Sequence, residues 1–266
     1  MIYFIQELKI RNETLFYYGL VCLLASFAFL ILTRMTSTQV YNVSAWYKPF
    51  KFAFSTFLYA WAMAWYCAYL KDFNNGFFNW AIIILLGFEI IYIAIQAGHG
   101  QLSHYNRSNG FYAGMYSLMA LAATLVTVFT AYVGILFFVN DFPDLPNHYL
   151  WGIRLGIAIF VIFSFEGFVM GSRLTHTIGG PDGSPGIWLL GWSKTFGDPR
   201  VAHFIGMHAL QVLPVLSFYI FRNTRITIII SIQYGLLALY TLVQALKGKP
   251  FLKNDNIHER VIPKKG

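Results

Sequence analysis

Long apolar stretches alternate with short polar segments along the chain. Each stretch is about 20 residues long, the length a helix needs to cross the hydrocarbon core of a bilayer. The stretches are continuous rather than alternating in polarity, so they predict helices and exclude a transmembrane barrel. We therefore expect an all-α, polytopic integral membrane protein that forms a seven-transmembrane-helix bundle. The predicted spans are residues 14–33, 50–70, 77–96, 112–137, 150–171, 203–221 and 226–246.

The polar segments between the spans are mostly short. Residues 1–246 are therefore expected to form a single transmembrane domain, followed by a basic tail over 247–266. The composition agrees, because 57% of the residues are hydrophobic and only 11% are charged. Such values exclude a soluble globular domain, a disordered chain and a coiled coil. Cys22 and Cys67 both lie in apolar stretches, so we expect buried thiols rather than a disulfide or a metal site.

Lysine and arginine residues set the predicted orientation in the membrane. The loops after the first, third and fifth spans, together with the C-terminal tail, hold 13 of the 19 basic residues, and the other side holds 6. This asymmetry places the C-terminus in the cytoplasm and the N-terminus outside, in a multi-pass protein of the cell membrane. The 13 are Arg34, Lys48, Lys51, Arg107, Arg173, Lys194, Arg200, Lys247, Lys249, Lys253, Arg260, Lys264 and Lys265.

The net charge of +8 has a different meaning here than in a soluble protein. We attribute it to topology and to contact with anionic lipid headgroups, and we expect no nucleic-acid partner. The basic residues at the cytoplasmic edge, beside helix N-termini, are also candidates to hold a phosphate or carboxylate group. The sequence leaves open a homo-oligomer or a membrane-protein partner. It contains no nucleotide-binding motif.

The longest connection, residues 172–202, is rich in glycine, proline and tryptophan. Its apolar piece, 187–192, is too short to span a bilayer. It is expected either to lie in the membrane interface, with Trp188 and Trp192 as anchors, or to form an ordinary surface loop. Asp198 is a natural N-cap for the sixth span. Because Pro49 and Pro199 occur at similar places, spans 1–3 and 5–7 are also compatible with a parallel repeat.

Ionisable groups inside a membrane are costly, so they are functional candidates by default. Glu89 lies in the third span, with Gln96 on the same face seven residues later. Glu166 lies in the fifth span, with Arg173 seven residues beyond it. These groups predict either a proton relay or substrate contact, or carboxyl groups that hold helices together. The candidate catalytic residues are Glu89, Glu166, Arg173 and Asp198.

Five of the seven histidines fall near the predicted cytoplasmic ends of the third to sixth spans. His203 and His208 are five residues apart and diverge on a helix, whereas His208 and Gln211 share a face. A metal or haem site would therefore need ligands from several helices. We take His104, His203 and His208 as candidate metal ligands and add Gln211 for a cofactor site, with hydrogen bonding between helix ends and loops as the alternative. The cofactor, if any, stays unknown.

Small residues and one proline make further structural predictions. The pairs Gly152/Gly156 and Gly167/Gly171 predict close packing of the fifth span against a neighbour. Pro214 is expected to interrupt the sixth span and to free a carbonyl group. The last span has no lysine, which a retinal Schiff base there would need, so we set aside a retinal protein.

Three functions fit these patterns. The first is a membrane enzyme or redox protein with a His/Arg/Glu site at the cytoplasmic ends of the third, fifth and sixth spans, acting on a lipid-like or quinone substrate. The second is a proton-coupled transporter or channel with Glu89 and Glu166 on its pathway. The third is a membrane sensor or assembly factor, since little of the chain lies outside the membrane.

Overall fold

The computed structural model describes residues 2–252, and this part of the chain is all-α, as predicted, with 72% of the protein helical. Two very short strands, β1 (Gln39–Val40) and β2 (Val43–Ser44), form a hairpin that the sequence did not predict. The helices are α1 (Ile2–Arg11), α2 (Glu13–Met35), α3 (Tyr47–Cys67), α4 (Asn75–Gly98), α5 (Gly110–Val139), α6 (Asn147–Arg173), α7 (Arg200–Leu216) and α8 (Thr224–Leu246), with a π-helical segment, Ser217–Phe221, after α7.

Six of these helices are long and apolar enough to cross a membrane. They are α2, α4, α5, α6, α7 with its π-helical segment, and α8. The predicted second span, 50–70, does form a 21-residue helix, α3. It is not among the six, because Lys48, Lys51 and several aromatic residues lower its hydropathy. The chain is thus a polytopic membrane protein by composition and length, while the seventh span stays a prediction.

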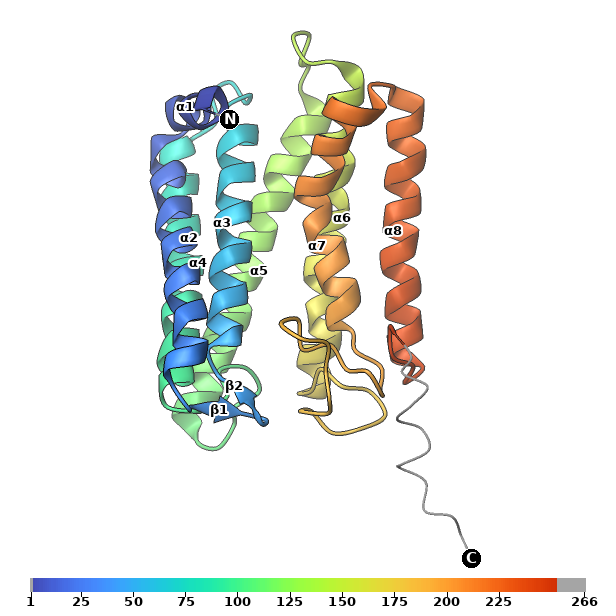
Figure 1. The fold of residues 1–266 in the computed structure, drawn as a ribbon. Coiled ribbons are helices and arrows are strands. Elements are labelled where there is room, and N and C mark those ends of the chain that lie inside the picture. The colour runs from blue at the N-terminus through green and yellow to red at the C-terminus, as the bar shows by residue number, and fades with distance from the viewer. Residues whose placement is uncertain (1, 253–266) are drawn as a thin grey trace, which may run out of the picture.

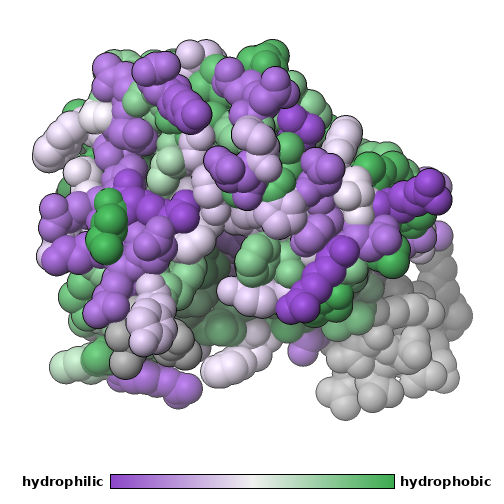
Figure 2. Space-filling model, turned by 90° about the horizontal axis from the view of Figure 1, so that it is seen from above, coloured by the Kyte–Doolittle hydropathy of each residue, from purple (hydrophilic) through white to green (hydrophobic). Residues whose placement is uncertain are grey.

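The helices form two groups that α5 joins (Figure 1). In the figure, α2, α3 and α4 lie on one side and α6, α7 and α8 on the other, while α5 runs obliquely between them. The hairpin and the long 174–199 connection lie at the lower end of this view, where α4 and α6 end and α3, α5 and α7 begin. We call this end the lower end. At the opposite end, where α1 lies, hydrophilic side chains cover much of the surface (Figure 2).

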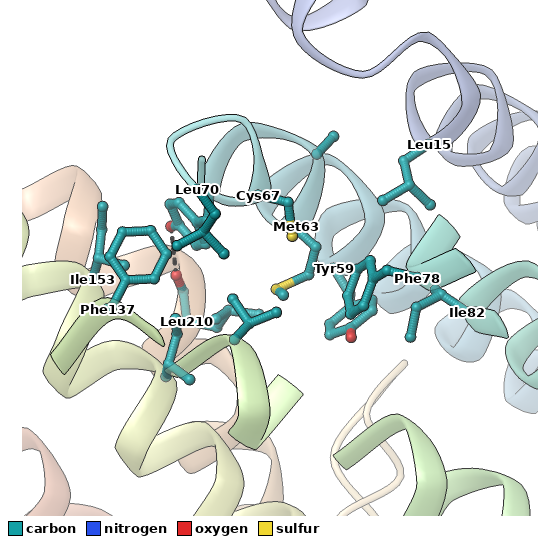
Figure 3. Close-up of a cluster of buried hydrophobic side chains, with 14 of the residues drawn as sticks. Leu15, Tyr59, Met63, Cys67, Leu70, Phe78, Ile82, Phe137, Ile153 and Leu210 are labelled. Carbon is teal, nitrogen blue, oxygen red and sulfur yellow. Dashed lines mark hydrogen bonds between the residues drawn. The ribbon is translucent and has the colours of Figure 1, made fainter. Parts of the chain in front are cut away.

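The upper half of the bundle is filled by apolar side chains (Figure 3). Tyr59, Met63 and Cys67 of α3 pack with Phe137 of α5 and Leu210 of α7 in one buried cluster. Met63, Cys67, Phe137 and Leu210 have no exposed surface. Cys22 is also buried, and both cysteines are free thiols, as predicted. This apolar cluster brings together side chains of both helix groups above the lower end.

Glycines allow α6 and α7 to approach closely, as the small-residue spacing predicted. A Cβ atom at Gly156 would lie 2.8 Å from the Ala209 carbonyl oxygen, and one at Gly167 would lie 3.2 Å from Cε1 of His203. One turn before Gly156, a Cβ atom at Gly152 would meet Ser217 and the backbone of Pro214. The small side chains thus set the distance between these two helices.

Pro214 shapes the upper part of α7. Proline has no N–H group, so the carbonyl four residues earlier, that of Leu210, loses its helical partner. The buried Tyr66 hydroxyl of α3 donates a hydrogen bond to this oxygen at 2.8 Å (Figure 3). The helix continues through Pro214 and widens into the π-helical segment at Ser217. The carbonyl that we expected Pro214 to free therefore connects the two helix groups.

We expect Tyr66→Phe to destabilise the protein by about 1–2 kcal/mol, because it removes the donor and leaves a buried carbonyl unpaired. In a Pro214→Ala background, residue 214 regains an N–H group for Leu210, so the same change should cost less than half as much. A double-mutant cycle on thermal unfolding in detergent measures this difference. Equal losses of unfolding free energy in both backgrounds would show that the Tyr66 hydroxyl does not compensate for the hydrogen bond that the Leu210 carbonyl loses.

Candidate functional site

Polar side chains from both helix groups gather at the lower end. The first turn of α3 supplies Lys48 and Lys51, which are half-buried. Lys48 Nζ lies 3.0 Å from Nδ1 of His104, which belongs to the connection between α4 and α5. Burial, and then the charge of Lys48, lower the pKa of His104 well below its ordinary value. His104 is therefore a neutral imidazole near pH 7, with Nδ1 as the acceptor.

Across from α3, Asp198 organises the start of α7. Its Oδ1 accepts from the backbone N–H of Arg200 at 3.2 Å and from Nε at 2.8 Å. Its Oδ2 accepts from Arg200 Nη2 at 2.6 Å and from the Ser193 N–H at 2.9 Å. Asp198 thus caps the first residue of α7, as predicted, although it stands one residue before the assigned N-cap, Pro199. These four bonds hold the carboxylate in place, and its catalytic role stays a prediction from the sequence.

His203 and Glu166 form the second part of the site. His203 Nδ1 lies 2.7 Å from the Phe163 carbonyl oxygen and 3.3 Å from Oε2 of Glu166. A carbonyl oxygen can only accept, so Nδ1 carries hydrogen and Nε2 is left free. The Glu166 side chain is 4% exposed, and neither of its oxygens has a hydrogen-bond partner. His203 itself is 30% exposed, so its free nitrogen can meet a bound molecule.

The 174–199 connection folds over this site rather than extending away from it. Isolated bridges between Ile178 and Gly197 and between Gly186 and Ser193 hold its two arms together. The Leu190 carbonyl oxygen accepts from Lys51 Nζ at 2.9 Å, and the Gly191 carbonyl accepts from Arg200 Nη2 at 2.6 Å.

The two tryptophans of the connection have different surroundings. Trp192 is 9% exposed and contacts the rings of Phe204 and Phe251. Trp188 is 72% exposed. Of the two predicted interfacial anchors, Trp192 thus packs inside the protein, while Trp188 is free to meet a lipid interface.

The remaining predicted residues lie apart from these contacts. Glu89 and Gln96 are both buried on the inner face of α4, as their spacing predicted, and the Gln96 amide donates to the Tyr92 hydroxyl. Arg173 is exposed at the end of α6. His208 packs against the ring of Phe204, and Oε1 of Gln211 is buried without a partner.

The candidate metal ligands do not form one group in the described part of the chain. Over residues 2–252, no three or more His, Cys, Asp or Glu side chains come together in a group that could hold a metal ion. His104, His203 and His208 share one end of the molecule, but each has its own surroundings: Lys48, Glu166 and Phe204, respectively. The role of these three histidines as ligands, and of Gln211 beside a cofactor, stays a prediction from the sequence.

Two pairings at the lower end could not be predicted from the sequence. The first is the pairing of Lys48 with His104. The charge pattern indicates Lys48 and Lys51 mainly as topology determinants, although their i, i+3 spacing places them on one helix face. His176 and Asp182 of the connection lie 3.2 Å apart, and Thr175 donates to the same Asp182 oxygen at 2.7 Å. The Gly–Pro segment around Asp182 gave no sequence signal for this pairing.

We expect acid to destabilise the connection through His176. Burial, and then Arg200, lower the pKa of His176 below its ordinary value of about 6.5. Its contribution to stability is therefore complete above pH 6.5 and is lost as the pH falls, because the unfolded chain binds the proton more tightly. Thermal unfolding at pH 5 should begin roughly 2–4 °C lower than at pH 7. His176→Gln should reduce this difference, and an unchanged difference would contradict the assignment.

No protein-family model, curated protein or solved structure matches this chain.

Proposed function

We propose that this chain is a membrane-embedded enzyme that works at its lower end, with His203 as the acid–base group. The observation that carries the proposal is the position of Nδ1, 2.7 Å from the Phe163 carbonyl and 3.3 Å from the Glu166 carboxylate. The carbonyl fixes the tautomer and aims Nε2 at the substrate, while the carboxylate stabilises the imidazolium that forms when Nε2 takes a proton. His203 is then the catalytic residue and Glu166 a positioning residue.

The surroundings favour a membrane-soluble substrate. The site lies at the end of the bundle where α3, α5 and α7 begin. Lys51 donates to the Leu190 carbonyl, two residues from the exposed Trp188. A lipid-like molecule or a quinone can therefore reach His203 from the bilayer without crossing the whole protein. Above the site, Tyr59, Met63 and Phe137 belong to a buried apolar cluster, which favours access from the lower end.

Conversion of lipids by the purified protein tests this proposal. The protein in lipid nanodiscs is incubated with a membrane lipid extract, and mass spectrometry compares the lipids before and after. We expect at least one lipid class to be converted by the wild-type protein and to remain unchanged with His203→Gln. Conversion at equal rates by both proteins would contradict the role of His203.

A proton-coupled transporter is the second candidate, and Glu89 is the observation that favours it. This carboxyl is 5% exposed in the middle of an apolar helix, and no hydrogen bond to it is found within residues 2–252. An intramembrane carboxyl of this kind is typical of proton pathways. Proton-driven flux into liposomes that disappears with Glu89→Gln, while His203→Gln still transports, would favour the transporter over the enzyme.

A further inference from the structure

The basic groups of the lower end have more hydrogen-bond donors than partners. An ammonium group has three N–H donors. Lys48 uses one on His104 at 3.0 Å, and Lys51 uses one on the Leu190 carbonyl at 2.9 Å. Two donors therefore remain on each lysine. Because both lysines are half-buried and not fully exposed, these donors are available to an acceptor group that binds at this end.

The positive charge of the two lysines is also not balanced. Over residues 2–252, neither lysine makes an ion pair with a carboxylate, and the ion pairs at this end involve other residues. Asp198, two residues before α7, is engaged by Arg200 and Ser193. Glu89 of α4 acts on Lys48 only through space, without an ion pair. Lys48, Lys51 and Arg200 lie close enough for their charges to repel one another.

Helix geometry places both lysines on one face of α3. Lys48 and Lys51 are three residues apart in the first turn of α3, so their side chains leave the same face of the helix. The N-terminal end of a helix carries partial positive charge and unpaired N–H groups. Arg200, at the start of α7, donates to the Gly191 carbonyl, next to the Leu190 carbonyl that Lys51 contacts, and so brings a third positive charge to the same region.

We propose that Lys48 and Lys51, with His104 behind them, form the binding site for a phosphomonoester group. A phosphate monoester carries about two negative charges near pH 7 and three acceptor oxygens. These match two ammonium groups with four unused donors. Because Lys48 donates to Nδ1 of His104, the ring hydrogen lies on Nε2 and adds another donor. A phosphodiester or a carboxylate, with a single charge, would leave one ammonium group unbalanced.

This inference rests on the proposed function and deepens it, because it names the substrate class of the same site. The phosphate would sit at the start of α3, and the rest of the molecule would extend toward His203. The phosphomonoester belongs either to a membrane lipid or to a soluble phosphate ester, and the two sources share the same recognition chemistry.

Binding of defined phosphates to the full chain in neutral detergent tests the inference. The probes are short-chain phosphatidic acid (a monoester), phosphatidylmethanol (a diester with the same acyl chains) and glycerol phosphate (a monoester without them). Phosphatidic acid should bind roughly tenfold more tightly than phosphatidylmethanol. The double variant Lys48→Gln/Lys51→Gln should weaken its binding roughly 10–100-fold, which is the range expected for charged hydrogen bonds.

The chain offers a matched control. Lys247→Gln/Lys249→Gln removes the same charge from exposed positions at the same end of the molecule, and we expect it to leave binding unchanged. Lys48→Arg/Lys51→Arg keeps the charge and should retain most of the affinity, which separates loss of the site from loss of the fold. Tight binding of glycerol phosphate that depends on Lys48 and Lys51 would support the site and assign it to a soluble ester.

Any of three results would overturn the inference. One is equal affinity for phosphatidic acid and phosphatidylmethanol. Another is a Lys48→Gln/Lys51→Gln variant that binds phosphatidic acid as tightly as the wild type, and the third is a control variant that weakens binding to the same degree. If lipid conversion depends on His203 while phosphate binding does not depend on Lys48 and Lys51, the proposed function is supported and the phosphate site is wrong.

Discussion

Gly156→Leu should be among the most destabilising substitutions in this protein. A Cβ atom at this position would lie 2.8 Å from the carbonyl oxygen of Ala209 and 3.4 Å from Cδ of Pro214. The first of these neighbours is backbone and the second is a rigid ring, so neither can rotate away. Leucine adds three further carbons in the same direction. The helices α6 and α7 must separate, at a cost of roughly 3 kcal/mol or more.

Gly114→Leu is the control for this prediction. It makes the same change inside α5, another long helix, where a Cβ atom would meet nothing within 4 Å. Thermal unfolding in detergent and the monodisperse fraction on size exclusion measure both variants. We expect Gly114→Leu to resemble the wild type and Gly156→Leu to unfold far earlier, with Gly156→Ala between them. Equal stability of the two leucine variants would show that α6 and α7 are not held at this distance.

His203→Gln should lower the rate of lipid conversion at least about 100-fold, which is the lower limit for loss of a general acid–base group. Glutamine preserves much of the volume of the imidazole but cannot accept and return a proton. The rate is measured with the lipid class that the wild-type protein converts. His99→Gln is the matched control, because His99 is exposed at the end of α4 and lies outside the site.

Glu166 should affect the rate through His203 rather than by direct contact. Glu166→Gln keeps the shape of the side chain but removes the charge that stabilises the imidazolium. We expect a loss smaller than that of His203→Gln, confined to kcat with KM unchanged, and partial recovery with Glu166→Asp. The double variant His203→Gln/Glu166→Gln should be no slower than His203→Gln alone. Additive losses would mean that Glu166 acts independently of His203.

Most of the helices could be predicted from the sequence because bilayer length and backbone hydrogen bonding leave few alternatives. The third predicted span, 77–96, is α4 at 75–98, and the fourth, 112–137, is α5 at 110–139. At the N-terminal ends, the differences of two residues come from N-caps. Asn74 and Asn109 each accept a hydrogen bond from the backbone N–H three residues later, a signal that the residue types alone could have given.

The candidate site was only partly predictable. Burial of Glu166 and the exposure of Arg173 agree with their places along α6. Asp198 was correctly expected at the start of α7, but the sequence could not show that Arg200 and Ser193 occupy its oxygens. The sequence indicates Lys48 only as a charge that sets topology. Nothing in it shows that His104, 56 residues away, is the hydrogen-bond partner of Lys48.

The sequence by itself determined that the chain enters a membrane and where most of its helices run, because each of those properties depends on residues close together in the chain. Only the tertiary structure decided which side chains meet at the lower end. His203 reaches Glu166 because glycines let α6 and α7 approach and fix their rotation. These contacts depend on the rotation and spacing of whole helices. Packing between helix faces sets the rotation and the spacing, and a linear pattern of residues does not encode that packing.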